Sequence, residues 1–147
     1  MKRIEDLNIL GIGDIMLDKY IYGTVDRISP EAPVPVLLVK EEYSTLGGSG
    51  HVVNNLRELG SKITCLSSIG NDLDGKIILD KLVELNVTPL LVTESETTIT
   101  KERIIASERK VQMIRIDKEI ITDIKAEILL KPLTNNYALS EFDIVVI

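Results

Sequence analysis

Short apolar runs alternate with amphipathic stretches along the chain. The run at 8–13 is closed by glycine and predicts a buried parallel strand. Runs at 62–69 and 88–92 predict two further strands, and apolar residues at helical spacing predict helices at 52–59 and 75–85. The apolar faces of these two helices comprise Val52, Leu56 and Leu59, and Ile78, Leu82 and Leu85. This alternation is typical of an α/β fold.

Two further pairs of strand-like runs lie outside this alternation. The runs at 20–25 and 35–39 flank RISPEAP, whose prolines exclude a helix and a central ladder, so we expect a small sheet or flap outside the main core. The runs at 97–105 and 111–117 are joined by ASERK and predict an antiparallel hairpin.

The last part of the chain predicts a helix and then a strand. Asp123 is the expected N-cap of a helix from Ile124 towards Leu139, which Pro132 should kink or split. The apolar run at 144–147 predicts a central strand. Because the alternation is half-finished, we expect the N-terminal part of a larger α/β domain. The alternative is a small complete domain with a C-terminal strand.

The charge and the cysteine content of the chain exclude some classes of function. The 147 residues carry a net charge of −6, which excludes a broad nucleic-acid surface and requires that any anion be held by a few placed cations. The only cysteine, Cys65, lies in an apolar run, so we expect a buried thiol and a cytoplasmic protein. No run spans a membrane, no signal peptide is recognisable, and one histidine with one cysteine makes no ordinary zinc site.

Neither glycine-rich segment fits a nucleotide-binding motif. The segment GNDLDGKI has phosphate-loop spacing, but Ile77 replaces the hydroxyl that binds magnesium, and Asp72 and Asp74 would add negative charge to a phosphate cradle. We therefore expect a turn whose aspartates cap the next helix. The segment LGGSGHVVNN lacks the third glycine of a dinucleotide loop, because Val53 occupies that position.

The second of these segments has groups suited to a sugar. Gly47 and Gly48 leave backbone N–H groups accessible, and His51, Asn54 and Asn55 add neutral polar groups. Neutral donors and acceptors match hydroxyls better than phosphates. The alternative is a tight connection into a helix.

Charged residues form two further candidate groups. Asp14 and Asp18 follow the first strand, at the end where α/β proteins bind ligands, although Asp14 is equally a turn former. Lys101 and Arg103 share one strand face, and the hairpin would bring Arg115 beside them as a phosphate clamp. The alternative is a solvated strand face on which Glu102, Glu108 and Asp117 are the salt-bridge partners.

Four ordered stretches resemble the ribokinase-like (PfkB-type) carbohydrate kinases. They are GDIMLDKYIYGTVDRISPEAPVPVLLV, GGSGHVVNNLRELG, IGNDLDGK and TITKERIIASERKVQMIRIDKE. The RISPEAPVPV run and the TITKxR…QxxRxD pattern are similar to the D-glycero-D-manno-heptose 7-phosphate kinase branch, which serves ADP-heptose and lipopolysaccharide synthesis in bacteria. The resemblance implies a partial α/β/α sandwich with a β lid at about 18–43, which commonly contributes to a homodimer.

The resemblance also implies a reaction and its site. ATP, with Mg²⁺, would phosphorylate the anomeric hydroxyl of heptose 7-phosphate. The LGGSG loop would lie against the sugar, and Asp18 would hold a hydroxyl. The 7-phosphate would meet Lys101, Arg103 and Arg115, with Gln112 nearby. The family's catalytic aspartate lies in a GAGD motif that this chain lacks. We therefore expect no catalytic residue or metal ligand here, ATP and Mg²⁺ bound mostly by a C-terminal half, and no activity in isolation.

One position departs from the family pattern. Related kinases read GGAANVAMN where this chain reads GGSGHVVNN, so His51 replaces the first asparagine while Asn55 matches the second. Because of this departure, a kinase for another phosphorylated sugar is one alternative function. A second alternative is a non-catalytic module for sugar-phosphate binding or dimerisation.

Overall fold

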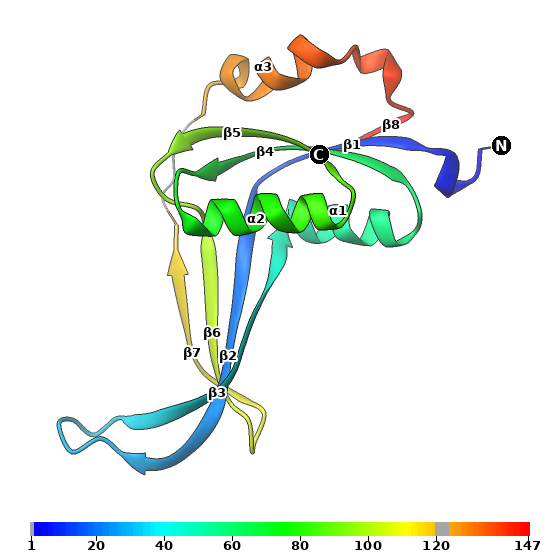
Figure 1. Ribbon diagram of the computed structural model, residues 1–147. Helices are drawn as coiled ribbons and strands as arrows, with labels where there is room; N and C mark the ends of the chain where they lie inside the picture. The colour runs from blue at the N-terminus through cyan, green and yellow to red at the C-terminus, as the bar shows by residue number, and fades with distance from the viewer. Residues whose placement is uncertain (1, 120–123) are drawn as a thin grey trace.

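A computed structural model describes residues 2–119 and 124–147, which form a parallel sheet between helices and a second sheet that projects from it (Figure 1). The parallel sheet has the order β5-β4-β1-β8. Its strands are β1 (Asn8–Ile12), β4 (Lys62–Gly70), β5 (Thr88–Ser95) and β8 (Ile144–Val146). Helices α1 (Ser49–Glu58) and α2 (Leu73–Glu84) cover one face, and α3 (Ala126–Asn136) covers the other. Single 3-10 turns lie at Ile4–Asp6 and Leu139–Glu141.

The core lies on both faces of the parallel sheet. Successive residues of β1 point to opposite sides, so Ile9 packs with the α1 and α2 layer while Leu10 packs with Leu133 of α3. Cys65 is fully buried, as expected, and burial raises the pKa of its thiol to about 11. The predicted α/β class is therefore confirmed as a layered α/β/α arrangement.

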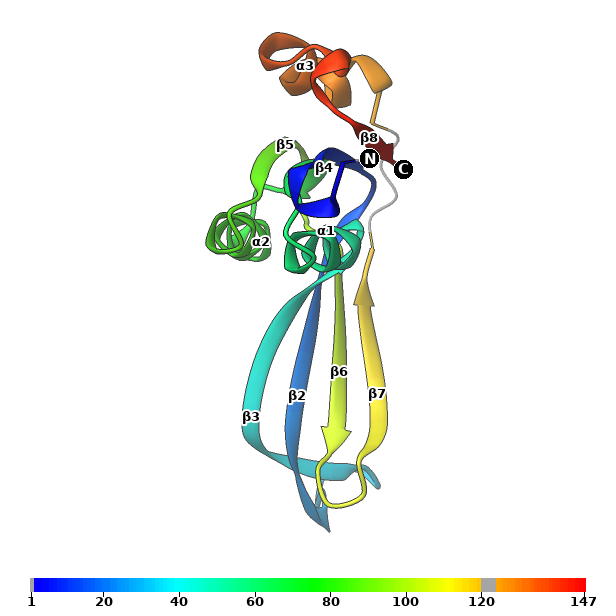
Figure 2. The same cartoon turned by 90° about the vertical axis from the view of Figure 1, so that its right-hand side faces the viewer.

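The second sheet contains residues 18–43, the segment expected to form a lid, and we call the whole sheet the lid. It has the order β3-β2-β6-β7 (Figure 2). Its strands are β2 (Ile15–Ile28), β3 (Pro35–Gly48), β6 (Thr100–Ala106) and β7 (Val111–Lys118). The antiparallel hairpin is confirmed, but β6 also pairs in parallel with β2. The predicted flap and the predicted hairpin are therefore one sheet, and the lid extends beyond 18–43.

Helix α1 buries a different face from the one predicted. Val53 is 1% exposed, whereas Val52 and Leu59 are 43% and 55% exposed. The helix follows β3 directly, and Gly50 packs against Ile15, which sets the rotation of the helix about its axis. Because Val52 and Val53 are both apolar, hydrophobic spacing alone did not determine this rotation.

The C-terminal part differs from the expectations in some details. Pro132 lies inside α3 and does not split it into two helices, and Leu133 beside it is buried against the sheet. The strand predicted to be central, β8, lies at the edge of the described sheet, where it pairs with β1. The helix begins after Lys125, and the predicted cap Asp123 lies outside the described residues.

The GNDLDG turn caps α2, as predicted, but only one aspartate does so. Asp72 Oδ1 accepts hydrogen bonds from Gly75 N at 2.9 Å and from Thr98 Oγ1 at 2.6 Å, and Asp72 Oδ2 accepts one from Thr98 N at 2.9 Å. Asp74 instead pairs with Lys19 of the lid, with Nζ and Oδ1 2.6 Å apart. The turn thus joins α2 to both lid segments.

The hydrogen bonds of Asp72 predict that part of the protein's free energy of unfolding is lost at acid pH. Burial by itself raises the pKa of Asp72, but the hydrogen bonds from Thr98 and Gly75 outweigh it, so the pKa lies below its usual value. A lowered folded-state pKa stabilises the protein above the unfolded value of about 4, and this contribution is lost as pH falls through the folded value. We expect Asp72→Asn to lower the free energy of unfolding by about 1 kcal/mol at pH 7 and by less at pH 3.

Urea unfolding of both proteins at the two pH values measures this difference. Asp80→Asn, on the exposed side of α2, is the matched control and should change stability little at either pH. A difference between wild type and Asp72→Asn that is equal at pH 7 and pH 3 would contradict the assignment.

Candidate functional site

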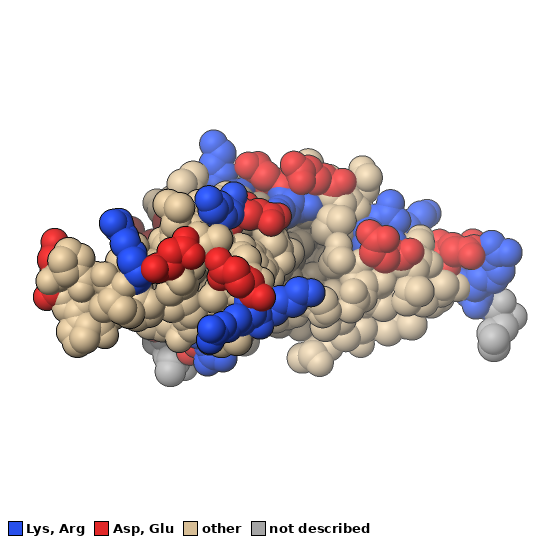
Figure 3. All heavy atoms as spheres, turned by 90° about the horizontal axis from the view of Figure 1, so that it is seen from below, with Lys and Arg blue, Asp and Glu red and all other residues tan. Residues whose placement is uncertain are grey.

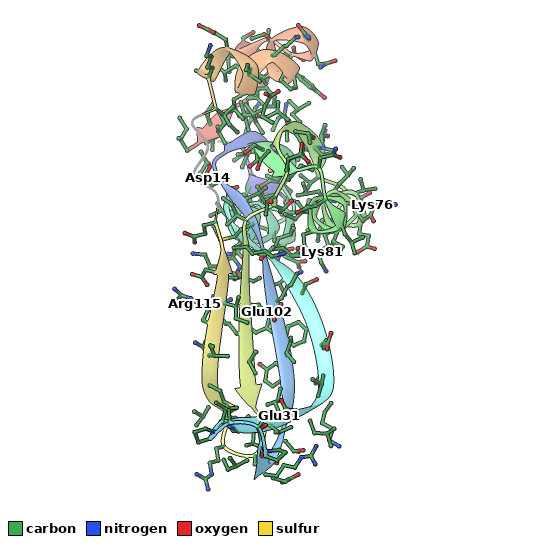
Figure 4. All side chains as sticks on the ribbon, turned by 90° about the vertical axis from the view of Figure 1, so that its left-hand side faces the viewer. Asp14, Glu31, Lys76, Lys81, Glu102 and Arg115 are labelled. Atoms are coloured by element: carbon green, nitrogen blue, oxygen red, sulfur yellow. The ribbon has the colours of Figure 1, made fainter. Side chains whose placement is uncertain are left out.

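The turn between β1 and β2 places Asp14 at the junction of the two sheets (Figure 4). Its backbone is held firmly, because Gly13 O accepts hydrogen bonds from Ser67 Oγ at 2.6 Å and from Ser49 Oγ at 3.0 Å. Ser49 N also donates to Asp14 O at 2.9 Å. The start of α1 and the end of β4 therefore fix the position from which the Asp14 carboxylate projects.

The glycine pair ends β3 instead of forming a separate loop. A Cβ on Gly47 would lie 2.3 Å from Asp18 Oδ2, and a Cβ on Gly48 would lie 2.4 Å from Asp14 O. Gly48 also has a φ of +59°, which favours glycine. The pair thus allows β3 to approach both aspartates closely.

A cavity of about 480 Å³ opens at the carboxyl ends of β1, β4 and β5. Its polar lining includes Asp14, Ser67, Ser68, Thr97, Thr98 and Glu119. Hydroxyl and carboxylate groups at this density suit a ligand with several hydroxyls. Except for Asp14, sequence reasoning missed these residues, because they come from separate strands and share no local motif.

One face of the lid gathers the charged residues that the sequence singled out. Residues that are paired across the four strands form two rows on this face. In the order β3, β2, β6 and β7, the rows are Thr45–Asp18–Lys101–Asp117 and Tyr43–Tyr20–Arg103–Arg115. A third row contains Tyr22, Ile105 and Gln112. We call this side the charged lid face. It brings together Asp18, Lys101, Arg103, Gln112 and Arg115.

Each of the three cations on this face already contacts a carboxylate. Arg103 Nη1 donates to Asp18 Oδ1 at 2.6 Å, and this bond keeps the pKa of Arg103 above its usual value. Lys101 Nζ lies 3.1 Å from Glu119 Oε1, and Arg115 Nε donates to Asp117 Oδ1 at 2.9 Å. Of the partners that the sequence offered as an alternative, Asp117 does pair with a cation of this face, whereas Asp18 and Glu119 were not among those expected.

The arrangement of the two arginines still favours an anion. Arg103 and Arg115 stand directly opposite each other on β6 and β7, and like charges in such a pair are unfavourable unless negative charge lies near them. Asp18 and Asp117 supply that charge here. On the face of the molecule seen in Figure 3, basic and acidic side chains are interspersed.

Three tyrosines extend this face. The rings of Tyr20 and Tyr43 are stacked with centroids 4.9 Å apart, and those of Tyr22 and Tyr43 with centroids 5.9 Å apart. The neighbouring Tyr22 hydroxyl raises the pKa of Tyr43 to about 12. Sequence reasoning missed this stack, although the alternation in KYIYG places Tyr20 and Tyr22 on one face of a strand.

The predicted residues of α1 lie apart from Asp14. His51 is exposed and lines a second cavity, of about 630 Å³, together with Asp18, Asn54 and Lys81. Asn55 is exposed and lines neither of these two cavities. The structure therefore divides the predicted sugar-binding residues between two places.

Among residues 2–119 and 124–147, no three His, Cys, Asp or Glu side chains gather as possible ligands for a metal ion. No helix in the same residues is long and apolar enough to cross a membrane.

Solved structures of sugar kinases are similar to this chain in fold. A possible 1-phosphofructokinase from Thermotoga maritima superposes with a TM-score of 0.67 at 21% identity, covering 94% of this chain and 43% of that one. Phosphofructokinase-2 from Escherichia coli, in complex with fructose-6-phosphate, gives a TM-score of 0.64 at 18% identity, covering 88% and 41%. The chain has the ribokinase-like carbohydrate kinase fold.

Sequence comparison gives a more specific relationship. The chain is 45% identical over 131 residues to the bifunctional protein HldE of Aliarcobacter butzleri, covering 87% of this chain and 27% of that protein. It is 50% identical over 120 residues to the HldE of Campylobacter concisus, covering 80% and 24%. The chain is thus related to HldE and spans about a quarter of the length of these relatives. No protein-family model matches it.

Proposed function

We propose that this chain forms the acceptor side of a carbohydrate kinase domain that phosphorylates D-glycero-D-manno-heptose 7-phosphate at its anomeric hydroxyl, for ADP-heptose and lipopolysaccharide synthesis. The observation that carries the proposal is the charged lid face beside the Asp14 cavity. Lys101 connects the two, because its partner Glu119 lines that cavity. The relationship to HldE supports heptose over other sugars.

The residues divide between the two ends of the sugar. Asp14 and the hydroxyls around it hold the ring, while Lys101, Arg103 and Arg115 hold the 7-phosphate through charge-assisted hydrogen bonds. When the phosphate reaches Arg103, it replaces the carboxylate of Asp18. Asp18 is then free to accept a hydrogen bond from a sugar hydroxyl.

In the proposed reaction, ATP with Mg²⁺ is the phosphoryl donor. They would bind mostly to parts of the kinase domain other than this chain, and they would supply the γ-phosphoryl group and neutralise its charge. The chain's own residues bind and orient the acceptor sugar. We therefore propose that the chain alone transfers no phosphoryl group.

The other lid face favours a second copy of the chain. Ile21, Ile104 and Ile114 form a row across β2, β6 and β7 on the side opposite Arg103. Ile114 and the nearby Ile116 are 52% and 45% exposed. An apolar patch of this kind is typical of an interaction surface, and we propose a homodimer formed through the lid.

Titration calorimetry with heptose 7-phosphate tests the function, with ribose 5-phosphate as the comparison. Selective binding of the heptose compound is the expected result. Absence of binding by a cooperatively folded chain would contradict the heptose assignment. Preference for ribose 5-phosphate would support a kinase for another phosphorylated sugar, the alternative that His51 favours.

A further inference from the structure

Arg103 is held on two sides by different kinds of contact. Asp18 binds one nitrogen, Nη1, through an ion pair of 2.6 Å. The guanidinium carbon Cζ lies 5.3 Å from the ring centroid of Tyr20, within the range of a cation–π contact. Tyr20 is itself stacked on Tyr43.

These two contacts respond differently to an arriving phosphate. The Asp18 carboxylate is an anion and competes with phosphate for the same N–H donors. The Tyr20 ring contacts the guanidinium through its π face and leaves the donors at the guanidinium edge free. A ring in this place therefore stays in contact with Arg103 when Asp18 is displaced.

We propose that Tyr20, supported by Tyr43, is a positioning residue that holds the Arg103 guanidinium in place for the phosphate of the sugar. The inference rests on the proposed function and adds a residue to it. Tyr20 acts through Arg103 and needs no contact with the sugar. Its ring matters and its hydroxyl does not, so phenylalanine is expected to replace it.

The test compares Tyr20→Val with Tyr20→Phe in two measurements. The first is ¹⁵N relaxation of the Arg103 Nε–H group without ligand, assigned by its loss in Arg103→Lys. We expect restricted motion in wild type and Tyr20→Phe, and faster, larger motion in Tyr20→Val. The second is calorimetry with heptose 7-phosphate and unphosphorylated heptose. We expect Tyr20→Val to bind the phosphate ester roughly fivefold more weakly, with binding of the unphosphorylated sugar unchanged.

Tyr22→Val is the matched control. Tyr22 stacks on Tyr43 at the end of the stack away from Arg103, so this variant should change neither measurement. If Tyr20→Val does not fold, Tyr43→Val removes the support behind Tyr20 and should give a smaller change of the same kind.

The two measurements separate this inference from the proposed function. If wild type binds no heptose 7-phosphate, the proposed function fails, and the Arg103 relaxation still decides whether Tyr20 positions the guanidinium. Unchanged Arg103 motion in Tyr20→Val overturns the inference, whatever the sugar. Equal loss of affinity for both sugars also overturns it, because a general distortion of the lid would do the same.

Discussion

Arg103→Met is expected to weaken binding of heptose 7-phosphate roughly 30-fold, about 2 kcal/mol, while affinity for unphosphorylated heptose stays within about twofold. The substitution removes forked donors from the phosphate and leaves Asp18 without its partner. The freed carboxylate then repels the phosphate. This double effect should make Arg103 more important than Lys101 or Arg115, because their partners Glu119 and Asp117 are more exposed than Asp18.

Arg109→Met is the matched control for this prediction. Arg109 lies in the exposed turn between β6 and β7, so the variant removes the same charge from the same hairpin. Calorimetry of both variants with both sugars should show a large loss only for Arg103→Met with the phosphorylated sugar. A similar loss for both sugars, or for both variants, would exclude a phosphate clamp at Arg103.

Gly70→Ala is expected to give the largest loss of stability, about 3 kcal/mol. A Cβ at Gly70 would lie 2.3 Å from Thr97 C and 2.3 Å from Thr98 N, both of which are backbone atoms. Backbone has little freedom to move here, because Gly70 N also donates to Thr98 Oγ1 at 2.9 Å. The new methyl group would therefore separate the end of β4 from the segment that leads into β6.

Urea unfolding measures this loss, with Gly11→Ala as the control. Gly11 lies on the neighbouring strand β1, and its added Cβ would meet the Val53 side chain at 3.1 Å, a contact that a small shift relieves. We expect the control to lose less than about 1 kcal/mol. Similar urea midpoints of unfolding for the two variants would contradict the prediction, because they would show that β4 and the Thr97–Thr98 backbone separate at little cost.

Local patterns in the sequence were enough to predict many of the elements. The strand at 62–69, the second helix with Ile78 and Leu82 in the core, and the hairpin at the end of the lid are all present. Hydrophobic periodicity determines such elements, because each depends on residues a few positions apart. The capping of α2 by Asp72 is of the same kind, since its partner Gly75 lies in the first turn of the helix.

The sequence did not reveal all of the residues that meet in the candidate site, because they come from segments that are far apart in the chain. The hairpin spacing indicated that Lys101, Arg103 and Arg115 share a face, and the tertiary structure added Asp18 through the parallel pairing of β2 with β6. The same pairing brought Tyr20 beside Arg103. Parallel pairing joins residues more than eighty positions apart, and no local pattern specifies its register.

The sequence by itself determined the α/β class and the burial of Cys65, because apolar spacing acts locally. Only the tertiary structure decided that Asp14 and His51 line different cavities and that Asp74 joins the lid through Lys19. These outcomes depend on how packed layers orient each element, and the rotation of α1 about its axis is one example. The physical reason is that side chains acquire their partners only when separate segments pack together.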